Sequence, residues 1–187
     1  EALVYLAEAY KRGTDSPALR FLLGQAMEPH AALLDTIEGQ IGKIQDLQLA
    51  PDGTWLAAAG DNHTVRLWST TDDRELRSLG GQGGPLIVVR VSSSGDRLVS
   101  LGMDAQARLW DPRDGTEVAH VRGYGGVFTS DGKRLLTVDT GNVARVWDAS
   151  DGHPLFEMSS PGGELIAIAA SADGTRIVTS GASGAVR

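Results

Sequence analysis

Residues Ser94–Asp111, SGDRLVSLGMDAQARLWD, decide the fold. A Ser-Gly-Asp turn leads into an apolar run, a Gly-Met-Asp turn follows, and a second short strand ends in Leu-Trp-Asp. Two turn signals that enclose aliphatic and β-branched residues predict a β-hairpin. The same arrangement occurs four times along the chain, which makes the prediction much stronger than a single hairpin would.

The four copies have a fixed inner spacing. The turn glycines are Gly53, Gly95, Gly132 and Gly174, and the first three are each followed 15 residues later by a tryptophan, at Trp68, Trp110 and Trp147. The glycines themselves are 42, 37 and 42 residues apart. This pattern predicts rigid hairpins joined by connections of variable length. A fourth tryptophan would fall two residues after Arg187, so we expect this sequence to be a fragment of a longer array.

A repeat of about 40 residues in which a Trp-Asp pair closes one strand is typical of a β-propeller blade. On these motifs the chain resembles the WD-repeat family over about residues 31–187. The units are LAPDGTWLAAAGDNHTVRLW, VSSSGDRLVSLGMDAQARLWD, FTSDGKRLLTVDTGNVARVWD and the partial ASADGTRIVTSGASGAVR. The resemblance implies a mainly β fold, with four-stranded blades at 42–79, 84–122 and 125–158 and an incomplete blade from 164. Each tryptophan should lie on a third strand, and the first strand of the shorter third blade should be stunted.

The family's polar network around the tryptophan is incomplete here. The resemblance implies a buried group of His, Ser/Thr, Asp and Trp in each blade. Gly-Gln or Gly-Tyr replaces the usual Gly-His, at Gln40, Gln82 and Tyr124. The Ser/Thr positions hold Ala58, Ser100, Thr137 and Thr179, and the Asp positions hold Asn62, Asp104, Gly141 and Ser183. Only the second unit keeps three of the four groups, so we expect apolar packing and backbone hydrogen bonds to hold the blades together.

Residues 1–30 have a different pattern. Apolar residues recur at helical spacing from Leu3 to Tyr10, and Asp15-Ser16-Pro17 is a typical helix start. We therefore predict an α-helical hairpin over 1–30, which resembles a tetratricopeptide-type unit or the helical lead-in of bacterial multidomain signalling proteins. Residues 31–38 are predicted to form a propeller-closing strand, so the predicted domains are 1–30 and 31–187.

The composition describes an ordinary globular chain, with 41% hydrophobic and 22% charged residues. The 24 glycines are explained by phased tight turns, and the absence of cysteine excludes disulfides and thiolate metal sites. No apolar run approaches the ~20 residues of a membrane span, and no signal pattern opens the sequence. We expect a cytoplasmic protein without membrane contact in this segment; any membrane tether would lie outside it.

No catalytic or cofactor constellation follows the repeat. The histidines at 30, 63, 120 and 153 occupy unrelated repeat positions, and the serines at 92–94 have no partnered base. Asp131-Gly132 and Asp173-Gly174 lack the remaining oxygen ligands of a calcium loop, and Gly80–Gly84 lacks the Lys-Ser/Thr of a phosphate loop. We therefore expect no enzyme activity, no cofactor and no metal.

An arginine precedes each tryptophan position by two residues, at Arg66, Arg108, Arg145 and Arg187. A ring of arginines could bind anions or nucleic acid. Alternatively, each arginine pairs with a carboxylate of a neighbouring blade or covers a tryptophan ring. The net charge of −7 favours the second interpretation, so no nucleic-acid partner is expected.

The family resemblance implies a non-catalytic scaffold for protein–protein interaction. The predicted partner-binding residues lie in the turns between second and third strands and in the connections between blades: Asp61, Asn62, His63, Gln82, Met103, Asp104, Tyr124 and Asn142. Met103 and Tyr124 are the expected apolar anchors. Two alternatives stay open, a regulatory propeller of a bacterial Ser/Thr kinase or STAND-type NTPase, and an enzymatic propeller.

Overall fold

The computed structural model describes residues 42–139, 141–159 and 165–182, together with residues 184 and 186. The chain divides into two compact units, Glu1–Gly39 and Gln40–Arg187, and all described residues belong to the second. The predicted helical hairpin over 1–30 and the predicted closing strand over 31–38 lie outside the described residues. The predicted division of the chain at residue 30 therefore stays a prediction.

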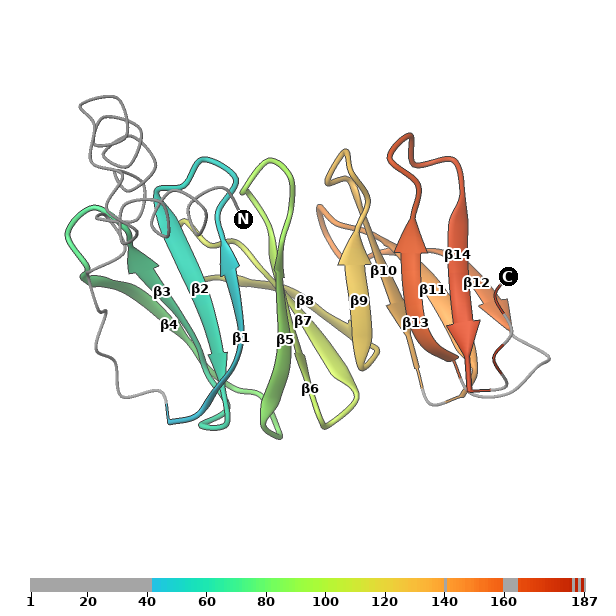
Figure 1. The fold of residues 1–187 in the computed structure, drawn as a ribbon, viewed down its shortest axis with the longest axis horizontal. Helices are drawn as coiled ribbons and strands as arrows, with labels where there is room; N and C mark the ends of the chain where they lie inside the picture. Colours follow the sequence, from blue (N-terminus) through green and yellow to red (C-terminus); the bar gives the residue numbers. More distant parts are fainter. Residues whose placement is uncertain (1–41, 140, 160–164, 183, 185, 187) are drawn as a thin grey trace, which may run out of the picture. The chain divides into compact units, whose positions relative to one another are not determined.

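Short strands form antiparallel sheets that follow one another in chain order (Figure 1). The first sheet contains β1 (Ile44–Leu49), β2 (Trp55–Gly60), β3 (Val65–Ser69) and β4 (Glu75–Leu79). The second contains β5 (Leu86–Val91), β6 (Leu98–Gly102), β7 (Gln106–Trp110) and β8 (Glu117–Arg122). The third contains β9 (Gly125–Phe128), β10 (Arg134–Val138), β11 (Val143–Asp148) and β12 (Pro154–Ser159). The fourth pairs β13 (Leu165–Ala170) with β14 (Ile177–Gly181).

This architecture confirms the mainly β prediction and the predicted extents of the blades. Trp68, Trp110 and Trp147 lie on β3, β7 and β11, which are the third strands of their sheets. The first strand of the third sheet, β9, has four residues, whereas β1 and β5 have six. The third repeat, which is the shorter one, therefore has the shorter first strand, as predicted. Among the described residues, no helix is long and apolar enough to cross a bilayer.

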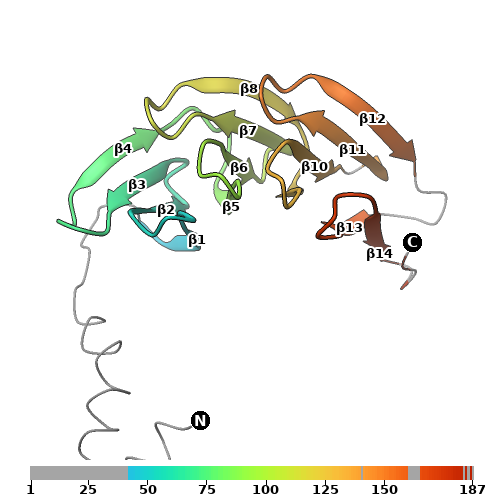
Figure 2. The same ribbon diagram turned by 90° about the horizontal axis from the view of Figure 1, so that it is seen from above.

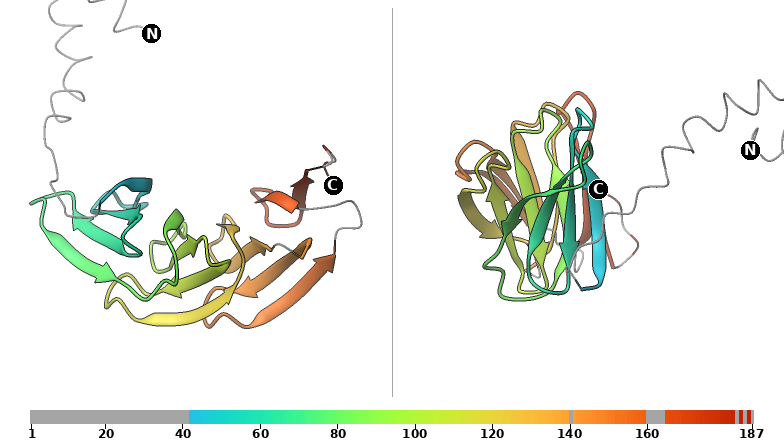
Figure 3. Two further views of the ribbon diagram at one scale, coloured as in Figure 1. Left: turned by 90° about the horizontal axis from the view of Figure 1, so that it is seen from below. Right: turned by 90° about the vertical axis from the view of Figure 1, so that its left-hand side faces the viewer.

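Neighbouring sheets pack face to face through apolar side chains. Leu98 and Trp110 of the second sheet belong to the same buried cluster as Leu67 of the first sheet. Leu109, which points to the opposite face of the second sheet, belongs to the same buried cluster as Leu135 of the third sheet. In the second and third sheets the tryptophan face therefore contacts the preceding sheet. Figures 2 and 3 show the first strands on one side of this series of sheets and the fourth strands on the other.

Each turn type repeats one left-handed residue. Gly53, Gly95, Gly132 and Gly174, in the turns between first and second strands, have φ angles of 73°, 75°, 69° and 66°. The turns between second and third strands place His63, Ala105 and Asn142 in the same region, and Gly184, which follows β14, is in it too. Three of these four residues carry a side chain, although the left-handed region disfavours residues with a Cβ. Position in the repeat, and not residue type, therefore sets the backbone conformation at these turns.

The aspartate of the Trp-Asp pair closes the turn between the third and fourth strands. Oδ1 of Asp111 accepts a hydrogen bond from the amide of Arg113 at 3.0 Å, and Oδ1 of Asp148 accepts one from Ser150 at 2.8 Å. In the first sheet Oγ of Ser69 accepts the corresponding bond from Thr71 at 3.2 Å. Serine is therefore a working replacement for aspartate in the first repeat, because either side chain offers an acceptor oxygen there.

Candidate interaction sites

The turns between second and third strands lie at the lower end of the sheets in Figure 1. We refer to residues 61–63, 103–105 and 141–142 as the rim. Asp61, Asn62 and His63 are exposed, and Met103 is the most exposed large apolar side chain of the described residues at 71%. Asp104 and Asn142 are half-buried. Six of the eight predicted partner-binding residues therefore lie on the rim.

Gln82 does not lie on the surface. Its residue exposure is 6%, and its side-chain Nε2 donates to Oγ of Ser100 at 2.5 Å. The same Oγ accepts a hydrogen bond from Nε1 of Trp110 at 2.8 Å. Gln82 thus occupies the place at which the resemblance implies a histidine, and the prediction that it presents its side chain to a partner is wrong. Its burial and its hydrogen bond to Ser100 make it a support of the second sheet.

Asp104 links the rim to the connection between the first two sheets. Its Oδ1 accepts from the amide of Gln106 at 3.2 Å, and its Oδ2 accepts from the amide of Gly83 at 2.9 Å. One carboxylate thus holds the turn that carries Met103 against the segment that carries Gln82. Its two oxygens satisfy backbone donors that would otherwise depend on solvent.

The third sheet builds its tryptophan contact without a glutamine. Nε1 of Trp147 donates to Oγ1 of Thr137 at 2.9 Å, and this hydroxyl donates to the backbone oxygen of Arg122 at 2.8 Å. Tyr124 is half-buried against the cluster that contains Val138, and its hydroxyl donates to the carbonyl of Leu165. Tyr124 therefore joins the third sheet to the fourth, and its expected role as an apolar anchor for a partner stays a prediction.

The arginines in phase with the tryptophans pair inside their own sheets. Arg66 contacts Glu75 at 2.9 Å, Arg108 contacts Glu117 at 2.7 Å, and Arg145 contacts Glu157 at 2.9 Å. Each glutamate lies on the fourth strand of the same sheet, next to the third strand that carries the arginine. The prediction of pairing with a neighbouring blade is wrong for these three. Arg187 lies outside the described residues.

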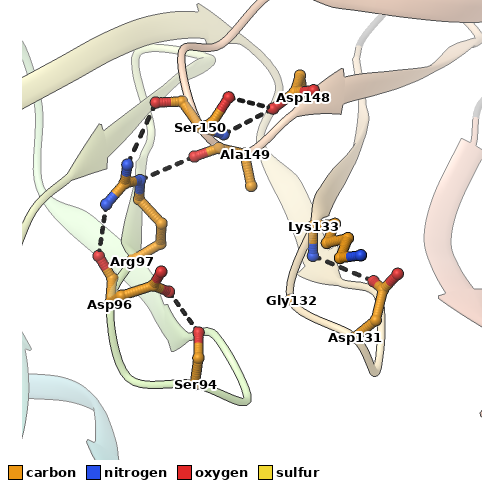
Figure 4. Close-up of a pocket in the computed structure, with 9 residues that line it drawn as sticks. All are labelled: Ser94, Asp96, Arg97, Asp131, Gly132, Lys133, Asp148, Ala149 and Ser150. Atoms are coloured by element: carbon orange, nitrogen blue, oxygen red, sulfur yellow. Dashed lines mark hydrogen bonds between the residues drawn. The ribbon is translucent and has the colours of Figure 1, made fainter.

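A groove of about 470 Å³ lies at the opposite ends of the strands, between the second and third sheets (Figure 4). Its lining comes from three turns: Ser94, Asp96 and Arg97; Asp131, Gly132 and Lys133; and Asp148, Ala149 and Ser150. Arg97 crosses the junction, where its Nε donates to the carbonyl of Ala149 at 2.9 Å and its Nη2 to that of Ser150 at 3.3 Å. The arginine therefore joins the two sheets and is not available to bind a ligand through these donors.

Hydrogen bonds keep the carboxylates of this groove ionised. Bonds from Ser94, Thr129 and Ser150 lower the pKa of Asp96, Asp131 and Asp148 respectively. Each carboxylate accepts hydrogen bonds from residues of its own turn. The main role of these charges is therefore to stabilise the turns. Within the described parts of the chain, no group of three His, Cys, Asp or Glu side chains is arranged to hold a metal ion.

The sequence did not predict this groove. Its residues lie in turns that mark the ends of strands in the sequence. A turn motif predicts where a strand ends, and it does not predict a groove between two sheets. The available signal is that Arg97 and Arg134 both follow a turn glycine by two residues. Such a signal gives the position of a side chain and not its partner, since the partner of Arg97 is a backbone carbonyl on another sheet.

The family described as "WD domain, G-beta repeat" matches residues 32–69, a segment that includes β1, β2 and β3. Three fungal relatives carry the name "Ribosome biogenesis protein erb1" or "ERB1". The protein of Botryotinia fuckeliana is 34% identical over 55 residues, which cover 29% of this chain and 7% of the relative. The Aspergillus niger protein is 35% identical over 56 residues, with the same coverage. The Meyerozyma guilliermondii protein is 41% identical over 39 residues, which cover 21% of this chain and 5% of the relative.

These relatives support the resemblance to WD repeats. They give no support to the alternative of a bacterial kinase or NTPase. The matched segments span at most about a fourteenth of each of these relatives, so a similarity in one repeat does not extend to their whole architecture. The first repeat of this chain is similar to a WD domain, G-beta repeat, and the same strand order recurs in the next two sheets.

Proposed function

We propose that this chain is a non-catalytic scaffold for protein–protein interaction and that the rim contacts the partner. One observation carries the proposal: a constant frame presents variable loops. The left-handed residue recurs at positions 63, 105 and 142, while the sequences around it are Asp-Asn-His, Met-Asp-Ala and Thr-Gly-Asn. A fixed backbone with different side chains is what recognition of an asymmetric protein surface requires.

Met103 is the expected centre of the contact. Its exposed thioether side chain is flexible and apolar, and methionine is enriched at protein interfaces. Asp61, Asn62, His63 and Asn142 would supply a polar surround. Gln82 supports this surface and is not part of it, whereas half-buried Tyr124 stays a predicted contact.

A protein partner fits the charge of the chain better than a nucleic acid. The net charge is −7, and three of the phased arginines are already paired with glutamates. The names of the fungal relatives refer to ribosome biogenesis, a process that assembles protein on RNA. Since the matched segments are 5–7% of their length, we carry over only the repeat and propose no RNA contact. A cytoplasmic location stays a prediction.

The test compares two surfaces of the same frame. The full chain is immobilised as wild type, as Met103→Asp and as Lys133→Glu, which alters the groove at the opposite end, and proteins retained from a cell extract are quantified. Loss of a buried anchor costs about 2 kcal/mol or more, so we expect at least a roughly tenfold loss of specific partners with Met103→Asp alone. Equal retention by the wild type and Met103→Asp would contradict the assignment of the rim. Substrate turnover by the purified chain would contradict the non-catalytic assignment.

A further inference from the structure

A smaller pocket lies between the first and second sheets, at the end of the strands opposite to the rim. Its volume is about 210 Å³, and its lining includes Trp55, Leu67, Leu76 and Arg77 of the first sheet and Pro112 and Arg113 of the second. Trp55 and Leu76 are half-buried and pack against the core cluster that contains Leu67. We refer to this space, which has an apolar floor and apolar walls, as the junction pocket.

One residue of the first repeat departs from the other repeats at this pocket. The residue that follows each turn glycine by two positions is arginine in the second, third and fourth repeats, but it is Trp55 in the first. Between the second and third sheets, Arg97 at this position donates to the carbonyls of Ala149 and Ser150 (Figure 4). The first junction therefore has an aromatic ring where the second junction has a guanidinium group.

Arg77 brings an unpaired positive charge to the junction pocket. Its Nη1 donates to the carbonyl of Leu76 at 2.6 Å, and its Nη2 donates to the carbonyl of Arg113 at 3.0 Å. Among the residues that the structure describes, no carboxylate pairs with Arg77 and no acceptor faces its Nε. The charge of Arg113 is already paired, because its Nε donates to Oδ1 of Asp111 at 2.9 Å. Arg77 is therefore the cation of the pocket that can still bind an anion.

The second sheet holds the side chain of Arg77 in place. A Cβ added to Gly115 would lie 3.6 Å from Cδ of Arg77, so the stem of the arginine runs along the turn between β7 and β8. The hydrogen bond to the carbonyl of Arg113 fixes the guanidinium beside the same turn. A guanidinium that is ordered before binding loses little side-chain entropy when it takes up a carboxylate.

We propose that the junction pocket binds the C-terminal residue of a partner protein when that residue is aliphatic or aromatic. Its side chain would enter the space beside Trp55 and Leu76, and its terminal carboxylate would accept hydrogen bonds from Arg77. A volume of about 210 Å³ is below the ~300 Å³ of sites for drug-sized ligands, so a single side chain fits the pocket better. The junction pocket is independent of the rim, because it lies at the other end of the sheets.

The size of the pocket favours a terminal carboxylate over the side chain of an aspartate or glutamate. Arg77 lines the same small space as the apolar walls, so the ligand has to present its apolar group and its carboxylate close together. A terminal carboxylate is attached to the same Cα as the apolar side chain. In an extended peptide the next side chain points to the opposite face, and the one after it is about 7 Å away.

The direct test titrates the peptide acetyl-Gly-Gly-Leu, with a free carboxylate, into the full chain and follows the tryptophan indole resonances by NMR. We expect the peptide to shift the indole of Trp55 and to leave the buried indoles of Trp68 and Trp110 unchanged. No shift of the Trp55 indole at millimolar peptide would overturn the proposal.

Three further peptides separate the groups that the pocket should recognise. Acetyl-Gly-Gly-Leu amide lacks the charge, acetyl-Gly-Gly-Gly lacks the apolar side chain, and acetyl-Gly-Leu-Asp amide carries its carboxylate on a side chain. Each should bind about tenfold more weakly or worse, since hydrogen bonds to a charged group contribute about 1.5–3 kcal/mol. Equal binding of the leucine amide, or of the Leu-Asp amide, would overturn the assignment of a terminal carboxylate. Equal binding of the glycine peptide would overturn the apolar subsite.

Arg77→Gln tests the cation, and Arg74→Gln is its matched control. Arg74 is an exposed arginine that pairs with Asp72 at 3.2 Å, so its substitution changes the net charge equally. Arg77→Gln should bind the free acid about tenfold more weakly and the leucine amide as the wild type does, whereas Arg74→Gln should bind both normally. Equal affinities of the two variants for the free acid would contradict the role of Arg77.

Trp55→Arg gives the first repeat the residue of the other three and should abolish the binding of both leucine peptides. Circular dichroism shows whether this variant folds, since Trp55 packs against the core. A folded Trp55→Arg that binds as the wild type does would overturn the assignment of the pocket. If it does not fold, the four peptides and the Arg77→Gln variant still decide the proposal.

Discussion

A left-handed backbone recurs at Gly53, Gly95, Gly132 and Gly174, and it costs a residue with a Cβ about 1–2 kcal/mol. A Cβ on Gly53 would meet nothing within 4 Å, so only the backbone opposes it. We expect Gly53→Ala to lower the free energy of unfolding by about 1 kcal/mol, since the alanine also restricts the unfolded chain. Gly53→Asn should cost less, because asparagine tolerates this region. Chemical denaturation measures both.

Gly80→Ala is the matched control for this change. Gly80 is not in the left-handed region, and its added Cβ would meet only Thr64, at 3.9 Å. Its free energy of unfolding should stay within about 0.5 kcal/mol of wild type. Equal effects at Gly53 and Gly80 would show that the turn conformation is not the cause.

The hydroxyl of Thr137, which is itself buried, accepts a hydrogen bond from the indole of Trp147 and donates one to the carbonyl of Arg122. Thr137→Val keeps the shape and removes both hydrogen bonds. We expect a loss of about 1–3 kcal/mol in the free energy of unfolding. Thr137→Ser keeps the hydroxyl and should lose less. A valine variant as stable as the serine variant would contradict the assigned role of the hydroxyl.

Single residues were the hardest part to predict from the sequence. The turn glycines were identified because glycine itself signals a left-handed turn. His63 and Ala105 adopt the same conformation without that signal, since the hydrogen bonding of the hairpin imposes it. The repeat position of Gln82 predicts that it lines the partner-binding face, but it does not show how deep that position lies below the rim.

At the scale of the turn elements, aspartates give the chain its acid sensitivity. The hydrogen bond from Arg113 lowers the pKa of Asp111 to about 2, and the bond from Ser171 lowers the pKa of Asp173 to about 2. A carboxyl whose pKa is depressed in the folded state stabilises the fold above its unfolded pKa, near 3.9. This stabilisation is lost as the pH falls through the folded pKa. Stability should therefore be constant from pH 8 to about 5 and fall between about pH 4 and 2.

Asp111→Asn and Arg113→Ala test this origin. The first removes the titrating group, and the second removes the main cause of its depressed pKa. Both should reduce the slope of stability against pH between about pH 4 and 2, measured by thermal unfolding. If the stability of both variants falls below pH 4 as steeply as that of the wild type, other carboxylates cause the loss of stability in acid.

The strands themselves were well predicted because the spacing from turn glycine to tryptophan fixes a hairpin. Pairing across strands was not predicted correctly. Arg108 and Glu117 are nine residues apart in the chain, but the adjacent third and fourth strands bring their side chains together within one sheet. A sequence period gives the phase of the arginines, whereas the register of the neighbouring strand decides their partners.

At the scale of the whole described unit, the first sheet has two exposed apolar side chains on its first strand. Leu47 and Leu49 of β1 are 57% and 54% exposed, and they lie opposite Ala58 and Leu56 on the tryptophan face. In the second and third sheets the corresponding face contacts the preceding sheet. Exposed apolar side chains of this kind favour association with another apolar surface. We therefore expect the 187-residue chain to self-associate, with an associated fraction that increases with protein concentration.

Leu47→Lys combined with Leu49→Lys should make the chain monomeric at concentrations at which the wild type associates, because two charges would have to be buried in the contact. Analytical ultracentrifugation at several concentrations measures this, and the circular dichroism of both proteins should agree, since neither leucine is in the packed core. The matched control is Met103→Lys, which places one charge on the rim and should associate as the wild type does. A wild type that stays monomeric at high concentration would contradict the prediction. Association abolished only by Met103→Lys would instead place the self-contact at the rim.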